Sequence, residues 1–346
     1  MKTQHQIFFK NAQSMEEISN ESVNLVVTSP PYPMIQMWDE MFSLMNPAIG
    51  NALNEMDGME AYLLMNEQLD KIWVEVDRTV APGGIVAINI GDATRKVGGR
   101  FQLYSNHSHI TRIFEDLEYQ VLPLIIWKKE SNKPTKFMGS GMIPPNAYVT
   151  LEHEYILLFR KEGPRRFSKE KMPKRKESSY FWEERNSWFS DIWHDLKGIS
   201  QGINDHNLRS RTAAYPLELV YRLINMYSVQ DDLVLDPFLG TGTTTLAAVS
   251  SARNSVGYEL ESNFTHIIEE KLIKASKLSK RIVKNRLDNH AKFVRKREKE
   301  GKPCKYQSLN YQMGVTTKAE TYIKFPLVKN VQKIGENYFE VSYHEK

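Results

Sequence analysis

The sequence has almost no cysteine and no long apolar run. Cys304 is the one cysteine among 346 residues, which excludes a disulfide framework and a cysteine-rich metal site. No apolar run approaches the ~18 residues that cross a bilayer, and the first residues lack the apolar core of a secretion signal. The histidines, among them His107, His109 and His153, show no metal-ligand spacing. We therefore expect a cytoplasmic protein that binds neither a membrane nor a metal.

Basic residues are unevenly distributed along the chain. The net charge is only +4, yet residues 160–176 hold nine Lys or Arg against two Glu, and residues 271–305 hold fourteen against three acidic residues. These two stretches carry +18, so the remainder carries −14. Concentrated basic segments are typical of proteins that bind polyanions, although either stretch alone also fits a solvated surface element.

Short apolar segments alternate with helical patterns, which predicts an α/β fold. Leu69, Ile72, Trp73, Val76 and Val80 have helical spacing, and Ala81–Gly84 is expected to end that helix. A second helix is expected to open at Pro216. The alternation favours a mostly parallel sheet with helices on both faces. The predicted strands are 24–28, 85–90, 121–127, 154–159, 233–236 and 255–259.

A glycine-rich turn follows one predicted strand. Residues 233–244 read LVLDPFLGTGTT, so an apolar strand enters a Gly-x-Gly turn at Gly240 and Gly242, and a helix begins near Thr243. Such a turn lets a ligand approach the backbone. The next predicted strand ends at Glu259, where nucleotide-binding folds hold ribose hydroxyls. By itself, a Gly-x-Gly sequence is usually just a tight turn.

The turn does not match the common phosphate-binding motifs. A triphosphate-binding loop needs a lysine after the second glycine, and none follows Gly242. The dinucleotide motif needs a third glycine where Thr245 stands. A nucleoside ligand without a pyrophosphate fits better, and S-adenosyl-L-methionine (AdoMet) is the commonest one.

A proline-rich turn follows the first of these strands. Residues 26–32 read VVTSPPY, and the two prolines fix φ and remove two backbone donors. The carbonyl groups of Ser29 and Pro30 are thereby held in place beside Tyr32. A flat ring could stack on Tyr32 while its amino group donates to the Ser29 hydroxyl and the Pro30 carbonyl. A turn that merely packs a tyrosine is the plainer interpretation for an isolated Pro-Pro-Tyr.

Together these motifs resemble those of the amino-methylating DNA methyltransferases of the β class. Thr28–Tyr32 is similar to the catalytic motif of that family, and Asp236–Thr244 to its AdoMet-binding motif. The catalytic motif comes first, which is the permuted β-class order, with the target-recognition region between the two. A serine at the start of Ser-Pro-Pro-Tyr is typical of cytosine-N4 enzymes, and residues 29–39 resemble methylases that modify CTAG sites.

The resemblance implies a domain division and a set of site residues. Residues 1–160 and 211–270 would be the catalytic and AdoMet-binding halves of one Rossmann-like domain, 161–210 an inserted target-recognition lobe outside the sheet, and 271–346 a basic extension. Asn11 stands where the family has an acidic residue near the adenine of AdoMet. The implied catalytic residues are Ser29, Pro30, Pro31 and Tyr32. The implied cofactor-binding residues are Thr28, Asn11, Tyr215, Pro216, Asp236, Phe238, Gly240, Gly242, Thr243 and Glu259. The implied DNA-binding residues are Arg165, Arg166, Lys174, Arg175, Arg209 and Arg211.

The resemblance implies methyl transfer from AdoMet to the N4 amine of a cytosine flipped out of duplex DNA. Such an enzyme would be the modification partner of a restriction endonuclease that acts on the same site without stable association. Cys304 lies in the basic tail, far from both motifs, so carbon-5 methylation is not expected. Adenine-N6 methylation by the same class, and an inactive DNA-binding module, remain the alternatives.

Overall fold

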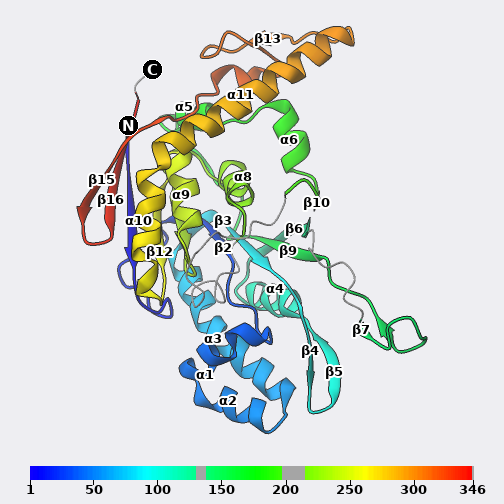
Figure 1. Cartoon of the computed structure of the whole chain (residues 1–346). Coiled ribbons are helices and arrows are strands. Elements are labelled where there is room, and N and C mark those ends of the chain that lie inside the picture. The colour runs from blue at the N-terminus through cyan, green and yellow to red at the C-terminus, as the bar shows by residue number, and fades with distance from the viewer. Residues whose placement is uncertain (130–137, 197–214, 345–346) are drawn as a thin grey trace.

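Figure 1 shows a computed structural model of the chain, in which residues 1–129, 138–196 and 215–344 are described. A sheet of ten strands runs through the molecule. Three further hairpins are formed by β4 (Ala93–Val97) and β5 (Arg100–Tyr104), β7 (Met138–Gly139) and β8 (Ala147–Tyr148), and β13 (Tyr306–Gln307) and β14 (Gly314–Val315). In spatial order the strands of the large sheet are β10 (Ile192–Trp193), β6 (Gln120–Lys128), β9 (His153–Arg160), β3 (Val80–Ile90), β2 (Val23–Thr28), β11 (Leu233–Asp236), β12 (Asn254–Tyr258), β1 (Lys2–Phe8), β16 (Tyr338–Tyr343) and β15 (Val328–Gly335).

Helices cover both faces of this sheet. Along β2, Leu25 and Val27 face the cluster that includes the helix 217–227, whereas Val26 faces the cluster that includes the helix 58–79, as the alternation of a strand requires. The helices are α1 (Asp39–Met45), α2 (Pro47–Asn54), α3 (Gly58–Thr79), α4 (Asn106–Asp116), α5 (Met172–Glu177), α6 (Trp182–Trp188), α8 (Leu217–Tyr227), α9 (Thr243–Ser250), α10 (Thr265–Ile273) and α11 (Ala275–Lys299), with 3-10 turns at Gln36–Trp38, Ser262–Phe264 and Lys318–Tyr322.

The five central strands, β3, β2, β11, β12 and β1, are parallel, so their carboxyl ends share one edge of the sheet. We call this the carboxyl edge. Antiparallel β9 separates β3 from β6, and β6 again ends at the carboxyl edge. Both predicted motifs begin there, because one follows β2 and the other follows β11. The predicted fold class and all six predicted strands are confirmed; the strand 233–236 has the predicted bounds, and the bounds of the other five differ by one to five residues.

Helix bounds differ slightly from the prediction. Pro216 is extended and caps α8, which begins at Leu217. The segment from Ala81 to Gly84 does end α3, but it already belongs to β3. None of the helices in the described part of the chain is both long and apolar enough to cross a membrane.

Two segments pack more closely than their sequences predict. The 161–210 stretch was expected to lie outside the sheet, yet β10 pairs with β6 through Ile192 and Trp193. Its aromatic residues Phe181, Trp188 and Trp193 are buried in the core. Residues 271–346 were predicted only as a basic extension, yet β16 pairs with β1 and β15 completes the sheet. Non-local pairing, which local sequence does not encode, is the physical reason for both differences.

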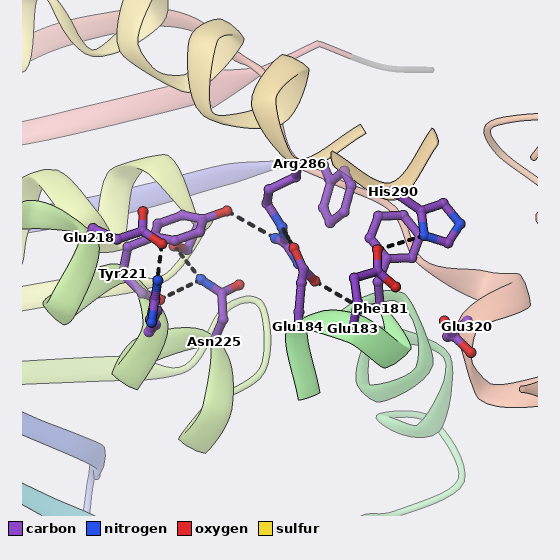
Figure 2. Close-up of polar contacts among 12 residues, drawn as sticks. Phe181, Glu183, Glu184, Glu218, Tyr221, Asn225, Arg286, His290 and Glu320 are labelled. Atoms are coloured by element: carbon purple, nitrogen blue, oxygen red, sulfur yellow. Dashed lines mark hydrogen bonds and ion pairs between the residues drawn. The ribbon is translucent and has the colours of Figure 1, made fainter. Parts of the chain in front are cut away.

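Helix α6 is also joined to helix α11 by ion pairs and hydrogen bonds. Figure 2 shows Glu183 and Glu184 of α6 reaching His290 and Arg286 of α11. The guanidinium of Arg286 donates to both oxygens of Glu184 at 2.5 and 2.6 Å and to the hydroxyl of Tyr221 on α8 at 3.0 Å. These contacts join segments that are 65 to 107 residues apart in sequence.

Candidate active site

The two motifs meet through a hydrogen bond between the ends of neighbouring strands. β2 and β11 pair in parallel, with Leu25 opposite Val234 and Val26 opposite Leu235. At their carboxyl ends, the buried Thr28 hydroxyl donates to Asp236 Oδ1 at 2.6 Å. The Ser-Pro-Pro-Tyr turn and the glycine-rich turn therefore leave the sheet side by side, although about two hundred residues separate them in sequence.

Asp236 organises the loops around this junction. Its Oδ2 accepts from the hydroxyl of Thr244 at 2.6 Å and from that of Tyr215 at 3.1 Å, and its Oδ1 also accepts from the backbone N–H of Phe238 at 3.0 Å. Burial raises the pKa of this carboxyl group, and the four donors oppose that effect by stabilising the charge. The protein itself thus supplies donors to both oxygens, and Asp236 acts by positioning Thr28 and the glycine-rich turn.

The glycine-rich turn presents open backbone at Gly240. Both glycines have positive φ, +54° at Gly240 and +78° at Gly242. A Cβ at position 242 would lie 3.0 Å from Ile268, whereas one at position 240 would meet no atom within 4 Å. A ligand can therefore approach the backbone at Gly240. Thr243 begins α9, as predicted.

Glu259 holds the same turn from the neighbouring strand. It follows β12, and its carboxylate accepts from the backbone N–H of Gly240 at 2.7 Å and of Glu261 at 2.9 Å. Burial raises the pKa of this carboxyl group. The turn is also held by Lys271 of α10, which donates to the carbonyl and the hydroxyl of Thr241 at 2.8 and 2.7 Å. Burial lowers the pKa of Lys271 to about 8. The turn is thus fixed on two sides.

The Ser-Pro-Pro-Tyr turn is fixed by a polar cluster on β3 and β9. Tyr32 Oη donates to Glu154 Oε2 at 2.9 Å, and Asn89 Nδ2 donates to Tyr32 Oη at 2.8 Å and to the same Glu154 oxygen at 2.7 Å. Lys129 Nζ donates to Glu154 Oε1 at 2.7 Å. Burial and the neighbouring Glu154 carboxylate raise the pKa of Tyr32, so the phenol keeps its proton.

This cluster sets the direction of the hydrogen bond at Ser29. The Ser29 and Tyr32 hydroxyl oxygens are 3.1 Å apart. Since the Tyr32 proton is directed to Glu154, the Ser29 hydroxyl donates to Tyr32 Oη. One lone pair of Ser29 Oγ accepts a long hydrogen bond from Asn89 Nδ2 at 3.5 Å, and the other is left to accept a hydrogen bond from a bound molecule.

The remaining predicted cofactor residues lie around the same edge. Asn11 comes shortly after β1, and its Oδ1 accepts from the backbone N–H of Gln13 at 2.9 Å. Phe238 packs against Trp73 with ring centroids 5.7 Å apart. Tyr215 and Pro216 are buried next to Asp236 and at the start of α8.

Sequence reasoning missed three polar residues of the site: Asn89, Lys129 and Glu154. Asn89 is a lone polar residue in the apolar run 85–90, and its side chain is 2% exposed. Glu154 is the second residue of another mostly buried strand, β9, and is 8% exposed. A polar residue inside an otherwise apolar strand is the signal that could have identified both.

The predicted DNA-binding residues are not brought to this edge. Arg165 donates to both oxygens of Asp232 at 2.6 and 2.8 Å, and Lys174 pairs with Asp231. Both aspartates precede β11, at the end of the sheet opposite Ser29. Arg166 and Arg175, which belong to the same segment, are exposed. These four residues are remote from the two motifs, and their assignment to DNA binding stays a prediction. Arg209 and Arg211 lie outside the described residues.

The comparison with known families agrees with the geometry of the two motifs. Residues 23–270 match the family of DNA methylases designated N6_N4_Mtase. The chain belongs to this DNA methylase family. The methylase is 59% identical to the Type II methyltransferase M.MthZI of Methanothermobacter thermautotrophicus, over all of this chain and 96% of that protein. It is 52% identical to M.MjaI of Methanocaldococcus jannaschii, over 78% of this chain and 91% of that protein.

A solved structure extends the likeness to three dimensions. The DNA modification methylase TTHA0409 of Thermus thermophilus, in complex with AdoMet, superimposes on the methylase with a TM-score of 0.61 and 30% identity, covering 78% of this chain and 94% of that chain. The methylase uses AdoMet as its cofactor. The residues present fit that molecule, because Gly240 leaves its backbone open and Glu259 lies beside it. Bound AdoMet would supply an electrophilic methyl group.

Proposed function

We propose that this DNA methyltransferase modifies the exocyclic N4 amine of cytosine in a short duplex target. The observation that carries the proposal is the Thr28–Asp236 hydrogen bond, since it holds the Ser-Pro-Pro-Tyr turn next to the glycine-rich turn. The serine at position 29 favours cytosine, because adenine-N6 enzymes usually have Asp or Asn there.

The chain's own residues would prepare the amine for attack. The lone pair of an exocyclic amine is conjugated into the ring, so the amine is a poor nucleophile. Ser29 Oγ and the Pro30 carbonyl would each accept one N–H and draw the nitrogen toward tetrahedral geometry. Tyr32 would stack on the base while its hydroxyl, fixed by Asn89 and Glu154, keeps Ser29 as an acceptor. Positioning of this kind supplies much of the rate in a direct transfer.

The proton that leaves the amine would pass to Ser29 Oγ. Ser29 would give its own proton to Tyr32 Oη, and Tyr32 would give its proton to the Glu154 carboxylate, so each hydroxyl loses one proton as it gains another and Glu154 ends as the carboxylic acid. The distances of 3.1 and 2.9 Å along this chain allow the transfer. The target base must leave the duplex stack to reach the site.

We further propose that the enzyme is the cytoplasmic modification component of a restriction-modification system. Its relatives M.MthZI and M.MjaI are named as Type II methyltransferases. The resemblance of residues 29–39 to CTAG-modifying methylases suggests CTAG as the target. A restriction endonuclease for the same site would be a partner in function and not a stable subunit.

Analysis of the methylated nucleoside tests this function. Unmethylated DNA is incubated with the enzyme and labelled AdoMet, digested to nucleosides and separated. We expect labelled N4-methyldeoxycytidine; labelled N6-methyldeoxyadenosine alone would refute the cytosine assignment. An inactive module would bind DNA but release no heat on calorimetric titration with AdoMet. Protection against a panel of restriction enzymes then identifies the site, with CTAG protected if the proposal holds.

A further inference from the structure

The β7–β8 hairpin carries the most exposed apolar side chains of the described chain. Met142 is 87% exposed, Ile143 71% and Val149 83%, and these are three of the six most exposed large apolar residues among those described. Met142 and Ile143 lie in the loop between the strands, and Val149 follows β8. Large apolar groups in water are unfavourable, so a cluster of them on a projecting loop indicates a surface that contacts a partner.

The base of this hairpin is next to the active site. β6 ends at the carboxyl edge, and the chain returns from the hairpin into β9, with Lys128 opposite His153. The following residue, Glu154, accepts the hydrogen bond from Tyr32. The hairpin is also braced against the β4–β5 hairpin by Phe101 and Tyr148, whose rings stack 4.6 Å apart at 17°. Figure 1 shows both hairpins extending from the same end of the sheet.

The electrostatic surroundings favour a polyanionic partner. Residues 139–151 include no acidic residue, and the exposed Glu152 follows them before β9. Exposed cations flank the hairpin, with Lys96 and Arg100 on the β4–β5 hairpin and Lys128 at the end of β6. Apolar side chains on an uncharged loop with lysine and arginine beside it can approach a phosphate backbone and enter the space between bases.

We propose that the β7–β8 hairpin is a DNA-contacting arm whose tip, Met142 and Ile143, enters the duplex beside the target base. This inference rests on the proposed function, because a base that has moved to Ser29 and Tyr32 leaves a gap in the stack. Apolar side chains that fill the gap stabilise the extrahelical state against return of the base. The lysines and arginine around the hairpin hold the backbone on either side.

A double variant with a matched control tests the arm. Met142→Ser with Ile143→Ser is compared with Ile273→Ser and Leu309→Ser, two apolar residues of similar exposure, 74% and 71%, elsewhere on the surface. The DNA is a duplex carrying the mapped site, with 2-aminopurine beside the target cytosine. We expect the arm variant to lose about tenfold in single-turnover rate at saturating DNA, and most of the rise in 2-aminopurine fluorescence that reports base extrusion. Its affinity for AdoMet stays that of the unmodified enzyme, and the control variant keeps both the rate and the fluorescence.

The outcomes separate this inference from the proposed function. If the unmodified enzyme methylates no DNA, the proposed function fails. If it methylates DNA and the arm variant extrudes the base and turns over at the same rate, only the arm proposal is overturned. A change of oligomeric state of the arm variant in light scattering would also overturn it, because the apolar tip would then be a contact between protein chains.

Discussion

A side chain at position 240 would enter open space at the glycine-rich turn. No atom lies within 4 Å of the place where its Cβ would be, and φ is +54°. We expect Gly240→Val to weaken AdoMet binding more than tenfold, because the side chain would occupy the space through which the cofactor approaches. A tenfold loss corresponds to ~1.4 kcal/mol of binding free energy. Gly301→Val is the matched control, since Gly301 follows α11 with a φ of +70° and equally open surroundings. Equal AdoMet affinities of the two variants in calorimetry would contradict the assignment.

Substitutions at Ser29 and at Gly240 are expected to impair different steps, turnover and AdoMet binding respectively. Ser29→Ala removes an acceptor for the amine and leaves the glycine-rich turn intact. We expect turnover to fall by about a hundredfold, similar to the loss of one oxyanion-hole donor, while AdoMet affinity is unchanged. Single-turnover rates and calorimetry distinguish the two effects. If Ser29→Ala loses cofactor affinity as Gly240→Val does, the roles of the two turns are misassigned.

Glu154 is expected to act through the direction of the hydrogen bonds at Tyr32. In Glu154→Gln the amide can donate to Tyr32 Oη, so the phenol proton can turn toward Ser29 and occupy the lone pairs that the substrate amine needs. We expect kcat to fall about tenfold with little change in KM or AdoMet affinity. Glu152→Gln, an exposed residue just before the same strand, is the control. A rise in KM with kcat intact would indicate a structural role only.

Local sequence pointed to the groups proposed to bind substrate and cofactor, but not to those that orient them. Ser29, Tyr32 and Gly240 belong to contiguous motifs whose spacing is recognisable in one dimension. Asn89 and Glu154 belong to other strands, and only the pairing of β3 with β9 brings them to Tyr32. Hydrogen-bond partners that come from separate strands leave no spacing pattern in the chain.

At the scale of elements, α6 and α11 are joined by His290, whose hydrogen bonds require a proton on both ring nitrogens. His290 is buried; Nδ1 faces Glu183 Oε1 at 2.8 Å and Nε2 faces the Gly314 carbonyl at 2.9 Å, so both nitrogens meet acceptors. The Phe181 ring stacks on the imidazole at 3.8 Å, as the right side of Figure 2 shows. Burial lowers the pKa of His290, but Glu183 and the Gly314 carbonyl, with Glu320 nearby, raise it above its usual value on balance.

This arrangement predicts that stability falls as the pH rises through the folded-state pKa of His290. A raised folded-state pKa means that the His290 contribution is complete below about pH 6.5 and is lost as the pH rises through the folded-state value. We expect His290→Gln to lower the free energy of unfolding by about 2 kcal/mol at pH 6 and by less at pH 9. His266→Gln, on the exposed surface of α10, is the control for the loss of an imidazole at a solvent-exposed position. An equal deficit at both pH values would refute the charged state.

The elements differed in how well their patterns predicted them. Buried parallel strands such as β2 and β11 are short apolar runs and were found. β16 was not predicted, although its buried residues Phe339, Val341 and Tyr343 alternate with less buried ones. Alternation alone does not tell which other strand such a segment pairs with. β10 has two residues and is too short to give a period.

At the scale of the whole molecule, the C-terminal strands complete the half that holds the glycine-rich turn. The Tyr343 hydroxyl donates to the Val249 carbonyl on α9 at 2.8 Å and contacts Thr3 at 2.9 Å. Thr3 contacts His5, which contacts Ser255 of β12 at 2.8 Å. Burial lowers the pKa of His5 to about 3, so the imidazole in this series of hydrogen bonds is neutral. The chain of buried hydroxyls therefore crosses from β16 to β12, the strand that leads to Glu259.

Removal of residues 328–346 should consequently impair cofactor binding from a distance. The truncation exposes the edge of β1 and removes Val328, Phe339, Val341 and Tyr343 from the cluster around α9 and α10. Burial of each large apolar side chain stabilises the fold by about 1.5–3 kcal/mol, so we expect a much lower melting temperature, aggregation, and loss of AdoMet binding. A synthetic peptide of residues 328–346 added in trans should restore binding by pairing with β1, whereas the same peptide with Val341→Lys should not, because the lysine would be buried. AdoMet affinity equal to that of the full chain in a stable truncated protein would show that the glycine-rich turn is supported by the central strands alone.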